Sequence, residues 1–166
     1  SFLSKQEAQR WGIDRLIGRS RAIQSIVTDV RRLQEADRTN VLILGETGTG
    51  KDLIARAIHF GSPRGNGPFI SVNCMTIPDH LAESQLFGHT RGAFTGATAS
   101  HKGYFEQASG GTLFLNEVGE MSVSLQAKFL QVLDEGHITP LGGTQRKQVD
   151  VRVVAATNAN LQAKIA

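Results

Sequence analysis

The sequence predicts an α/β fold in which helices cover both faces of a parallel sheet. Short apolar, β-branched runs alternate along the chain with segments whose apolar residues recur at helical spacing, a pattern typical of parallel sheets. The first apolar run also leads directly into a glycine-rich stretch, residues 45–51, and a helical pattern follows it. At 166 residues with 40% hydrophobic content, the chain suits one domain of ordinary size.

Each predicted element follows from its own pattern. Apolar residues at helical spacing predict helices over Arg21 to Ala36, Lys51 to Phe60 and Val123 to Glu135. The last helix is expected to bury Leu125, Phe129, Leu130, Val132 and Leu133. Continuous apolar runs predict strands at Val41 to Leu44, Phe69 to Cys74, Thr112 to Asn116 and Val151 to Ala156. Ligands of such folds bind at the carboxyl ends of the strands, so the glycine-rich stretch after the first strand marks the expected site.

This stretch, Gly45-Glu46-Thr47-Gly48-Thr49-Gly50-Lys51, has the spacing of a nucleotide phosphate-binding loop. Its glycines let backbone N–H groups turn inward toward an anion, Lys51 can reach the terminal phosphates, and the next helix presents the positive end of its dipole. Asp52 stands where most such loops carry a Ser or Thr that binds Mg²⁺. An ionised carboxylate cannot donate a hydrogen bond, so Asp52 is expected either to help hold hydrated magnesium or to turn away from the site.

Two later strands end in polar residues suited to nucleotide hydrolysis. The third ends in Asn116 and Glu117, where a metal-holding group and a water-activating carboxylate commonly lie beside the γ-phosphate. Aspartate is usual in the first position, and asparagine lacks its negative charge, so Asn116 is expected to hold hydrated Mg²⁺ less well. The alternative for this pair is a buried strand that ends in a helix cap. Asn158, after the fourth strand, could contact the γ-phosphate or the attacking water.

Between the second and third strands, Gly92-Ala93-Phe94-Thr95-Gly96-Ala97 holds a Phe-Thr pair bracketed by glycines. Such small, flexible residues predict an exposed loop with an aromatic tip rather than a helix interior. An apolar side chain on a glycine-hinged loop indicates a contact element that moves with nucleotide state. The alternative is a surface loop whose Phe94 folds back onto the core.

Composition argues against several other classes of function. A net charge of +3, without a stripe of Lys and Arg, does not by itself indicate nucleic-acid binding. The single cysteine, Cys74, excludes an internal disulfide framework and is expected to be a buried, inert thiol. The five histidines lack metal-ligand spacing, and His89 and His101 are expected to serve the surface beside the loop.

The ends of the chain and its hydropathy predict its surroundings. No apolar run approaches the roughly 18 residues of a membrane span, and the first residues lack the apolar core of a signal peptide. We therefore expect a cytoplasmic protein without a membrane partner. Because the chain starts without methionine and stops in mid-pattern, we expect it to be a piece of something longer.

Together these motifs resemble the AAA+ ATPases, a branch of the P-loop NTPases. The intact GAFTGA at residues 92–97 resembles the signature loop of bacterial enhancer-binding proteins, the NtrC-like AAA+ activators that remodel sigma-54 RNA polymerase. Leu16-Ile17-Gly18-Arg19-Ser20 resembles the family's segment near the adenine, GETGTGK its Walker A loop and GGTLFLNE its Walker B strand. The resemblance covers residues 16–166, a truncated AAA+ sigma-54 interaction domain without its C-terminal helical lid, and leaves residues 1–15 as a linker.

The resemblance implies a role for each candidate residue. ATP would be bound by Ile17 and residues 45–52, and Mg²⁺ by Asn116 and Asp52; family members commonly carry Glu at the position of Asp52. Glu117 would polarise water, Asn73 would restrain Glu117, and Asn158 would be the sensor-one residue. Residues 92–97 would contact sigma-54, and Gly136 to Asp150 resembles the second pore loop, which moves with the first.

The resemblance also implies partners and an activity. Family members form hexameric rings, and DNA would be contacted by a domain outside this chain. The change to Asn116 and the missing lid and arginine fingers predict an ATPase with weakened Mg²⁺ handling and slow hydrolysis. The alternative, in another class, is a nucleotide-gated interaction module that binds ATP and its partner without turnover.

Overall fold

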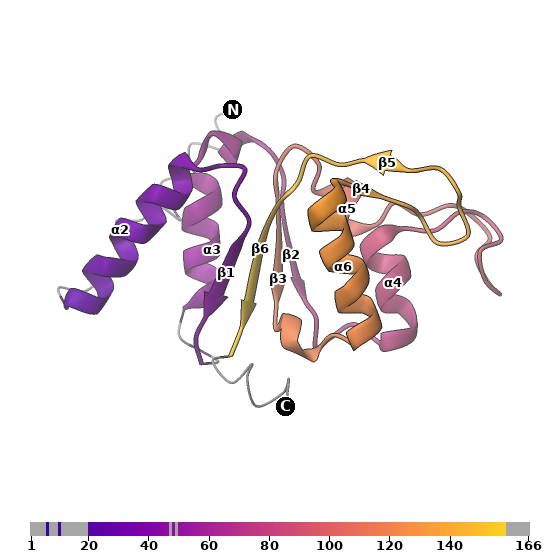
Figure 1. Ribbon diagram of the computed structural model, residues 1–166, viewed down its shortest axis with the longest axis horizontal. Helices are drawn as coiled ribbons and strands as arrows, with labels where there is room; N and C mark the ends of the chain where they lie inside the picture. The colour runs from indigo at the N-terminus through magenta and orange to yellow at the C-terminus, as the bar shows by residue number, and fades with distance from the viewer. Residues whose placement is uncertain (1–5, 7–9, 11–19, 47, 49, 159–166) are drawn as a thin grey trace.

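Four parallel strands form the central sheet of the computed structural model, which describes residues 6, 10, 20–46, 48 and 50–158. The strands are β1 (Val41–Leu44), β2 (Phe69–Asn73), β3 (Thr112–Asn116) and β6 (Arg152–Thr157). Their spatial order is β1-β6-β3-β2, so the last strand in the sequence lies between the first and the third. All four carboxyl ends meet at one edge of the sheet (Figure 1). The predicted parallel sheet is confirmed, with strand ends within one residue of those expected.

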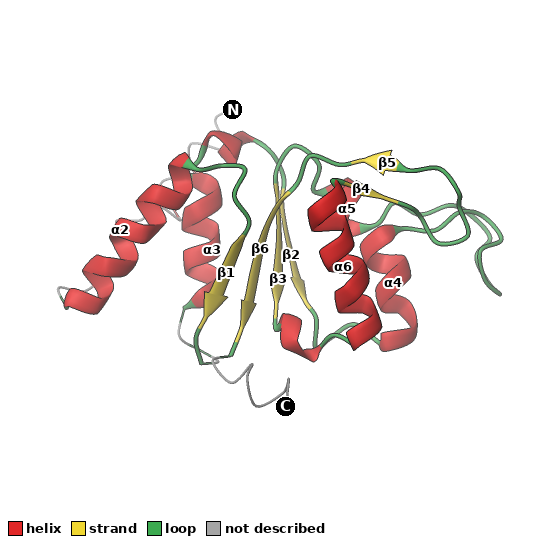
Figure 2. Cartoon of the chain, viewed as in Figure 1, coloured by secondary structure: helices red, strands yellow, loops and turns green. Residues whose placement is uncertain are grey.

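Helices cover both faces of this sheet, as predicted (Figure 2). On one side lie α2 (Arg21–Glu35) and α3 (Lys51–Phe60), and on the other α4 (Asp79–Phe87) and α6 (Val123–Glu135). The hydroxyls of Ser20 and Ser122 accept hydrogen bonds from the first turns of α2 and α6, which explains where these helices begin. A short helix, α5 (Tyr104–Gln107), and two 3₁₀ turns, η2 (Pro63–Asn66) and η3 (Val118–Glu120), complete this part of the chain.

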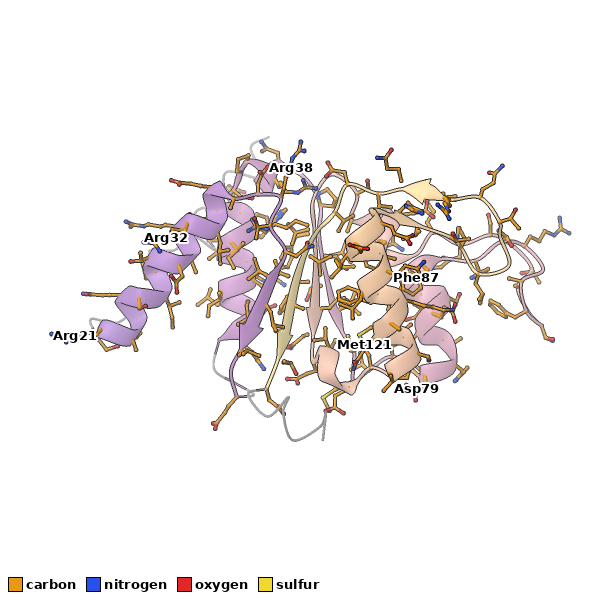
Figure 3. The ribbon with its side chains drawn as sticks, viewed as in Figure 1. Arg21, Arg32, Arg38, Asp79, Phe87 and Met121 are labelled. Atoms are coloured by element: carbon orange, nitrogen blue, oxygen red, sulfur yellow. The ribbon has the colours of Figure 1, made fainter. Side chains whose placement is uncertain are left out.

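The side chains of the central strands alternate between two hydrophobic cores. Phe114 and Val154 pack with Ile58 under α2 and α3, whereas Leu113 and Leu115 face α4 and α6. In Figure 3, Phe87 and Met121 lie on the α4 and α6 side, and Arg21 and Arg32 lie on α2 at the far side of the sheet. These two cores fix the sheet between its helical layers.

One predicted core residue is wrong. Leu130 of α6 is 62% exposed, whereas Leu125, Phe129 and Val132 of the same helix are buried. The buried residues lie three or four positions apart along one face, and Leu130 follows Phe129 onto the next face of the helix. It lines an apolar cavity of about 320 Å³ together with the exposed Leu42 of the edge strand β1.

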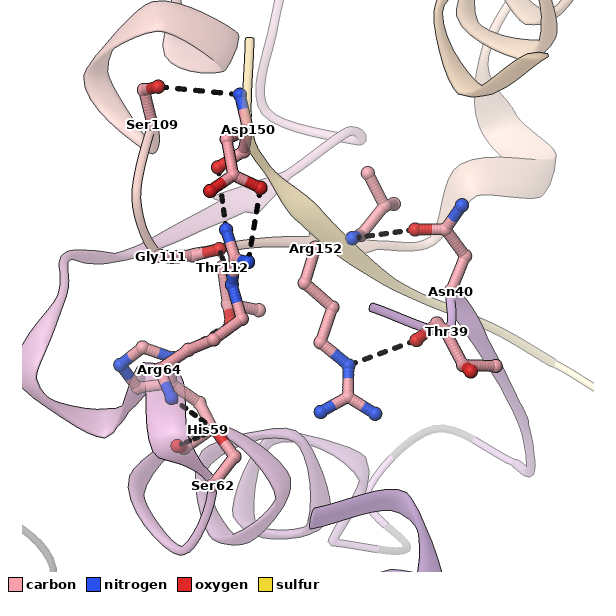
Figure 4. A network of polar contacts seen from close by, with 11 residues as sticks. Thr39, Asn40, His59, Ser62, Arg64, Ser109, Gly111, Thr112, Asp150 and Arg152 are labelled. Carbon is pink, nitrogen blue, oxygen red and sulfur yellow. Dashed lines mark hydrogen bonds and ion pairs between the residues drawn. The ribbon is translucent and has the colours of Figure 1, made fainter. Parts of the chain in front are cut away.

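Buried arginines hold the amino ends of the strands, at the edge opposite the glycine-rich loop (Figure 4). Arg64 donates to the carbonyls of Gly111 and Asp150 over 2.9 and 2.6 Å. Arg152 donates to the carbonyl of Thr39 over 3.0 Å. Burial lowers the pKa of Arg152. These bonds satisfy backbone carbonyls where the strands begin, so they stabilise the sheet at a distance from the candidate site.

His59 belongs to the same network. It is fully buried, and its ring lies 2.7 Å from the Thr112 hydroxyl and 3.2 Å from the Gly67 carbonyl. Because burial penalises the charged ring, the pKa of His59 falls from 6.5 to about 4. The ring is therefore neutral in the folded protein near pH 7. None of the described helices is long and apolar enough to cross a membrane.

Candidate nucleotide-binding site and interaction loop

The glycine-rich loop connects the end of β1 to the first residue of α3. Its first residue is tied to β6, because the Gly45 amide donates to the Thr157 carbonyl over 3.2 Å. Gly48 and Gly50 both have φ of 85°, a left-handed conformation that glycine adopts without strain. Gly50 caps α3, so the free N–H groups of the first helical turn lie at the loop. The candidate residues Thr47 and Thr49 lie outside the described residues, as does Ile17.

Lys51 folds back across this loop. Its ammonium donates to the Gly45 carbonyl over 2.9 Å and to a carboxylate oxygen of Glu117 over 3.3 Å. The side chains of Lys51 and Glu117 are only 6% and 9% exposed, so this ion pair is buried. Strand order explains the contact, because β6 alone separates β1 from β3. Glu117 directly follows β3, and Lys51 begins the helix after the loop that follows β1. The lysine of the phosphate-binding loop and the glutamate after β3 are therefore neighbours.

The backbone of Glu117 is strained. Its φ of 59° and ψ of 47° make it the one non-glycine residue with positive φ in the described part of the chain. Such a conformation costs on the order of 1 kcal/mol or more and persists where surrounding contacts impose it, often at functional sites. Glu117 stands at the cap position of η3, but its side chain makes no capping hydrogen bond there. Its carboxylate is directed instead to Lys51.

Asn116 presents an unpaired acceptor beside this ion pair. Its side-chain oxygen is buried and has no hydrogen-bond partner within the described residues. An orphan acceptor at this edge fits a water molecule that is bound to a cation, because such a water donates a hydrogen bond. The described residues contain no cluster of three or more His, Cys, Asp and Glu side chains. The Asn116 oxygen is thus compatible with the hydration shell of a magnesium ion.

Two other asparagines stand at the same edge. Asn73 of β2 is in register with Asn116, and its side-chain oxygen accepts a hydrogen bond from the Met75 amide over 3.0 Å. The glutamate that Asn73 is expected to restrain is held by Lys51 in this conformation. Asn158 follows β6 and is half-buried, between the strands that carry the phosphate-binding loop and Glu117.

Asp52, in the first turn of α3, is half exposed. Its carboxylate pairs with Arg56 one turn later, over 3.0 Å, and the Arg56 guanidinium lies 5.0 Å from the centre of the Phe69 ring. The structure thus places the carboxylate of Asp52 against its own helix. Its two expected arrangements, holding hydrated magnesium or turning away from the site, stay predictions, and Arg56 is its partner in the described conformation.

Cys74 directly follows β2 and is half-buried rather than fully buried. Burial, with a smaller contribution from the negative charge of Glu117, raises the pKa of the thiol to about 11. A thiol with so high a pKa carries almost no thiolate near neutral pH, which agrees with the expected lack of reactivity.

The predicted loop at residues 92–97 projects beyond α4 on a short stem. The Gly92 amide donates to the Ala97 carbonyl over 2.9 Å, which closes the loop. Phe94 is 39% exposed, and its ring stacks edge-to-face on His89 with centroids 4.9 Å apart. The tip is thus neither fully exposed nor folded into the core. His89, expected to serve the surface, is half-buried at the base of the loop, whereas His101 is exposed.

A small hairpin lies against the base of this loop. It consists of β4 (His137–Ile138) and β5 (Lys147–Gln148), which the sequence patterns did not predict. In the turn between them, the Leu141 amide donates to the Gly88 carbonyl over 2.9 Å, and the Leu141 carbonyl accepts from Thr90 over 3.0 Å. These bonds join the loop that resembles the second pore loop to the first.

Comparison with known proteins shows which family the chain resembles. The family model described as the sigma-54 interaction domain matches residues 16–166. The Nif-specific regulatory protein of Enterobacter agglomerans is 50% identical over 157 residues, which cover 95% of this chain and 30% of that protein. The chain thus spans about a third of the length of such relatives.

Solved structures show the same likeness. NtrX from Brucella abortus in complex with ADP aligns with a TM-score of 0.81 and 37% identity, over 97% of this chain and 34% of that one. Its complex with ATP aligns with a TM-score of 0.80 and 38% identity, over 90% of this chain and 32% of that one. With a family model that matches almost its full length, the chain belongs to the sigma-54 interaction domain family and has the AAA+ fold of the sigma-54-dependent activators.

Proposed function

We propose that this chain binds ATP at the carboxyl edge of its sheet and uses it to act on sigma-54 RNA polymerase through residues 92–97. One observation carries the proposal: the buried pair of Lys51 and Glu117 joins the phosphate-binding loop to the end of β3. A cation and a carboxylate at this place can bind a γ-phosphate and orient the water that attacks it. The structures of NtrX in complex with ADP and with ATP support nucleotide binding by a domain of this family.

The other residues at this edge have supporting roles in the proposal. The backbone of residues 45–51 wraps the phosphates, Ile17 lies near the adenine, and Asn158 contacts the γ-phosphate or the water. Asn73 restrains Glu117 once Lys51 has turned to the phosphates. Magnesium would supply positive charge to the phosphates, and the unpaired oxygen of Asn116 would accept a hydrogen bond from its hydration shell, with Asp52 as a second holder once its carboxylate leaves Arg56.

Hydrolysis in this chain is slow in our proposal because Asn116 replaces a carboxylate. Its neutral oxygen attracts hydrated magnesium less than an aspartate would, so nucleotide binding persists while turnover falls. A second function, a module that binds nucleotide and partner without turnover, is favoured by the same observation. The two differ only in whether phosphate is released.

Phe94 and Thr95 make the partner contact in this proposal. Phe94 is partly exposed on a loop whose backbone bonds are local, from Gly92 to the Ala97 carbonyl and from Ala97 to the Phe94 carbonyl, so its side chain can move without disturbing the sheet. The longer protein would assemble as a hexameric ring in the bacterial cytoplasm and contact DNA through a domain outside residues 16–166, with residues 1–15 as a linker. Such a ring would present the loops of several subunits to one partner molecule.

Binding and turnover test the proposal together. ATP and ADP are titrated calorimetrically with and without Mg²⁺, phosphate release is followed in parallel, and sigma-54 is then added in each nucleotide state. We expect nucleotide binding, slow phosphate release, and sigma-54 binding that depends on nucleotide and is lost in Phe94→Ala. If nucleotide binds without phosphate release, the interaction module is the better description. If no nucleotide binds, both functions fail.

A further inference from the structure

The side chain of His89 connects three separate parts of the interaction loop and its support. Its Nδ1 lies 2.6 Å from the hydroxyl of Ser84, a buried residue in the last turns of α4. Its Nε2 lies 3.0 Å from the carbonyl of Ala99, on the segment that returns from the loop. Its ring also supports Phe94, edge-to-face at 4.9 Å. One imidazole thus contacts the helix, the return segment and the tip.

These contacts determine the tautomer of the ring. A carbonyl can only accept, so Nε2 carries the hydrogen and donates it to Ala99. In the neutral ring, Nδ1 then accepts a hydrogen bond from the Ser84 hydroxyl. Both ring nitrogens are therefore satisfied, and the ring plane is fixed before Phe94 packs against it.

Backbone hydrogen bonds near His89 hold the stem of the loop, whereas the position of the Phe94 tip depends on the His89 side chain. His89 and His101 exchange two backbone hydrogen bonds of 3.0 and 2.9 Å, which hold the stem of the loop. Beyond this pair, the loop is closed by short local bonds, such as that from Gly92 to Ala97. Among the ring contacts within the described residues, Phe94 packs on His89 alone. The stem is anchored by backbone, whereas the tip is anchored by an imidazole.

We propose that His89 is the positioning residue that holds the Phe94 tip closed against the stem of the loop until a partner or a nucleotide state releases it. This inference rests on the proposed function of residues 92–97 as the partner contact. In it, Ser84 and Ala99 orient the ring, and the ring covers part of the Phe94 surface that a partner would bury. Release of the tip therefore requires loss of the His89–Phe94 contact.

The size of the effect follows from the contacts that are lost. An edge-to-face aromatic pair and a neutral hydrogen bond together correspond to roughly a tenfold change in the equilibrium between the closed and open loop. His89→Ala removes the ring contact and the hydrogen bonds to both Ser84 and Ala99, so we expect the open loop to become at least about tenfold more populated. Ser84→Ala removes only the hydrogen bond that orients the ring, so we expect a change of roughly threefold.

Hydrogen exchange measures this equilibrium directly, without any partner. In His89→Ala, the amides of Gly92 and Ala97, both hydrogen-bonded in the closed loop, should exchange about tenfold faster. His89→Gln keeps a donor for Ala99 but lacks the ring, so its exchange should fall between wild type and alanine. His80→Ala is the control, because it removes an exposed imidazole from the first turn of α4 and should leave exchange unchanged, whereas His101 is unsuitable because its ring lies 5.6 Å from that of His89. The proposal is overturned if loop exchange in His89→Ala equals wild type, or rises equally in β3.

Binding of sigma-54 then separates this inference from the proposed function. Without nucleotide, His89→Ala should bind sigma-54 about tenfold more tightly than wild type, and the double variant with Phe94→Ala should lose that gain. If exchange rises as expected but no variant binds sigma-54, the positioning role stands and the proposed partner is wrong. If wild type binds sigma-54 and His89→Ala changes neither exchange nor binding, the partner stands and the positioning role of His89 is wrong.

Discussion

Glu117→Gln tests whether the ion pair at the sheet edge competes with nucleotide. In the described conformation, Lys51 is held by Glu117, yet Lys51 is also the residue that must reach the β and γ phosphates. Nucleotide binding therefore has to break this pair. Glutamine keeps the size of the side chain and an oxygen that can accept from Lys51, but it removes the negative charge that attracts the ammonium, while the Gly45 carbonyl stays as the other partner of Lys51.

The magnitude follows from the geometry. At 3.3 Å, two unit charges attract by about 5 kcal/mol at an effective dielectric constant near 20. Desolvation of both buried groups offsets part of this, and a charged hydrogen bond contributes about 2 kcal/mol net. That net loss affects the nucleotide-free protein, whereas in the complex Lys51 pairs with phosphate in both variants. We therefore expect ATP to bind roughly 30-fold more tightly to Glu117→Gln.

Calorimetric titration of ATP into wild type and Glu117→Gln provides the assay. Thermal unfolding without nucleotide should show a lower midpoint in the variant, and saturating ATP should close most of that gap. Glu120→Gln is the control. It also removes one negative charge, three residues after Glu117, but Glu120 is not part of the Lys51–Glu117 pair. Equal ATP affinity in wild type and Glu117→Gln would refute the idea that the pair opposes binding.

Three further predictions concern other parts of the molecule. Asn116→Asp should strengthen the Mg²⁺ dependence of ATP binding and speed phosphate release several-fold, because it places a negative charge beside the phosphates. Calorimetry and a phosphate-release assay, each with and without Mg²⁺, check this. Equal turnover in the two proteins would contradict it. Gly142→Ala should lower the free energy of unfolding, measured with denaturant, by about 1 kcal/mol or more. Gly142 has φ of 77°, and an added Cβ would lie 2.7 Å from the Cβ of Ala93. Gly143→Ala is the control and should cost less, because Gly143 lacks positive φ. The pKa of His59 is about 4 in the folded protein and 6.5 ordinarily, so the unfolded chain takes up a proton more readily. The resulting contribution to the free energy of unfolding, about 3 kcal/mol, is fully present above pH 6.5 and is lost as the pH falls toward 4. The pH slope of unfolding free energy in that window should be shallower in His59→Gln, and parallel slopes would refute the assignment.

Local patterns were sufficient for the elements with strong periodicity. The strand before Gly45, the helix after Lys51 and the helix that buries Phe129 all lie where apolar spacing places them. Helix α4 was missed because its buried residues, among them Ala82, Ser84 and Leu86, are mixed in polarity and leave no single apolar face. The strands of the β4–β5 hairpin have two residues each, too few to show an alternation.

The sequence by itself determined the phosphate-binding loop, the strand-end polar residues and the glycine-bracketed Phe94, because each is a local arrangement of residue types. Only the tertiary structure decided which of them meet. The insertion of β6 between β1 and β3 brings Lys51 to Glu117, 66 positions later in the chain. The packing of α4 against the loop stem likewise places His89 under Phe94. Strand order and helix packing join residues that are distant in sequence, and they depend on burial summed over the whole domain rather than on any local pattern.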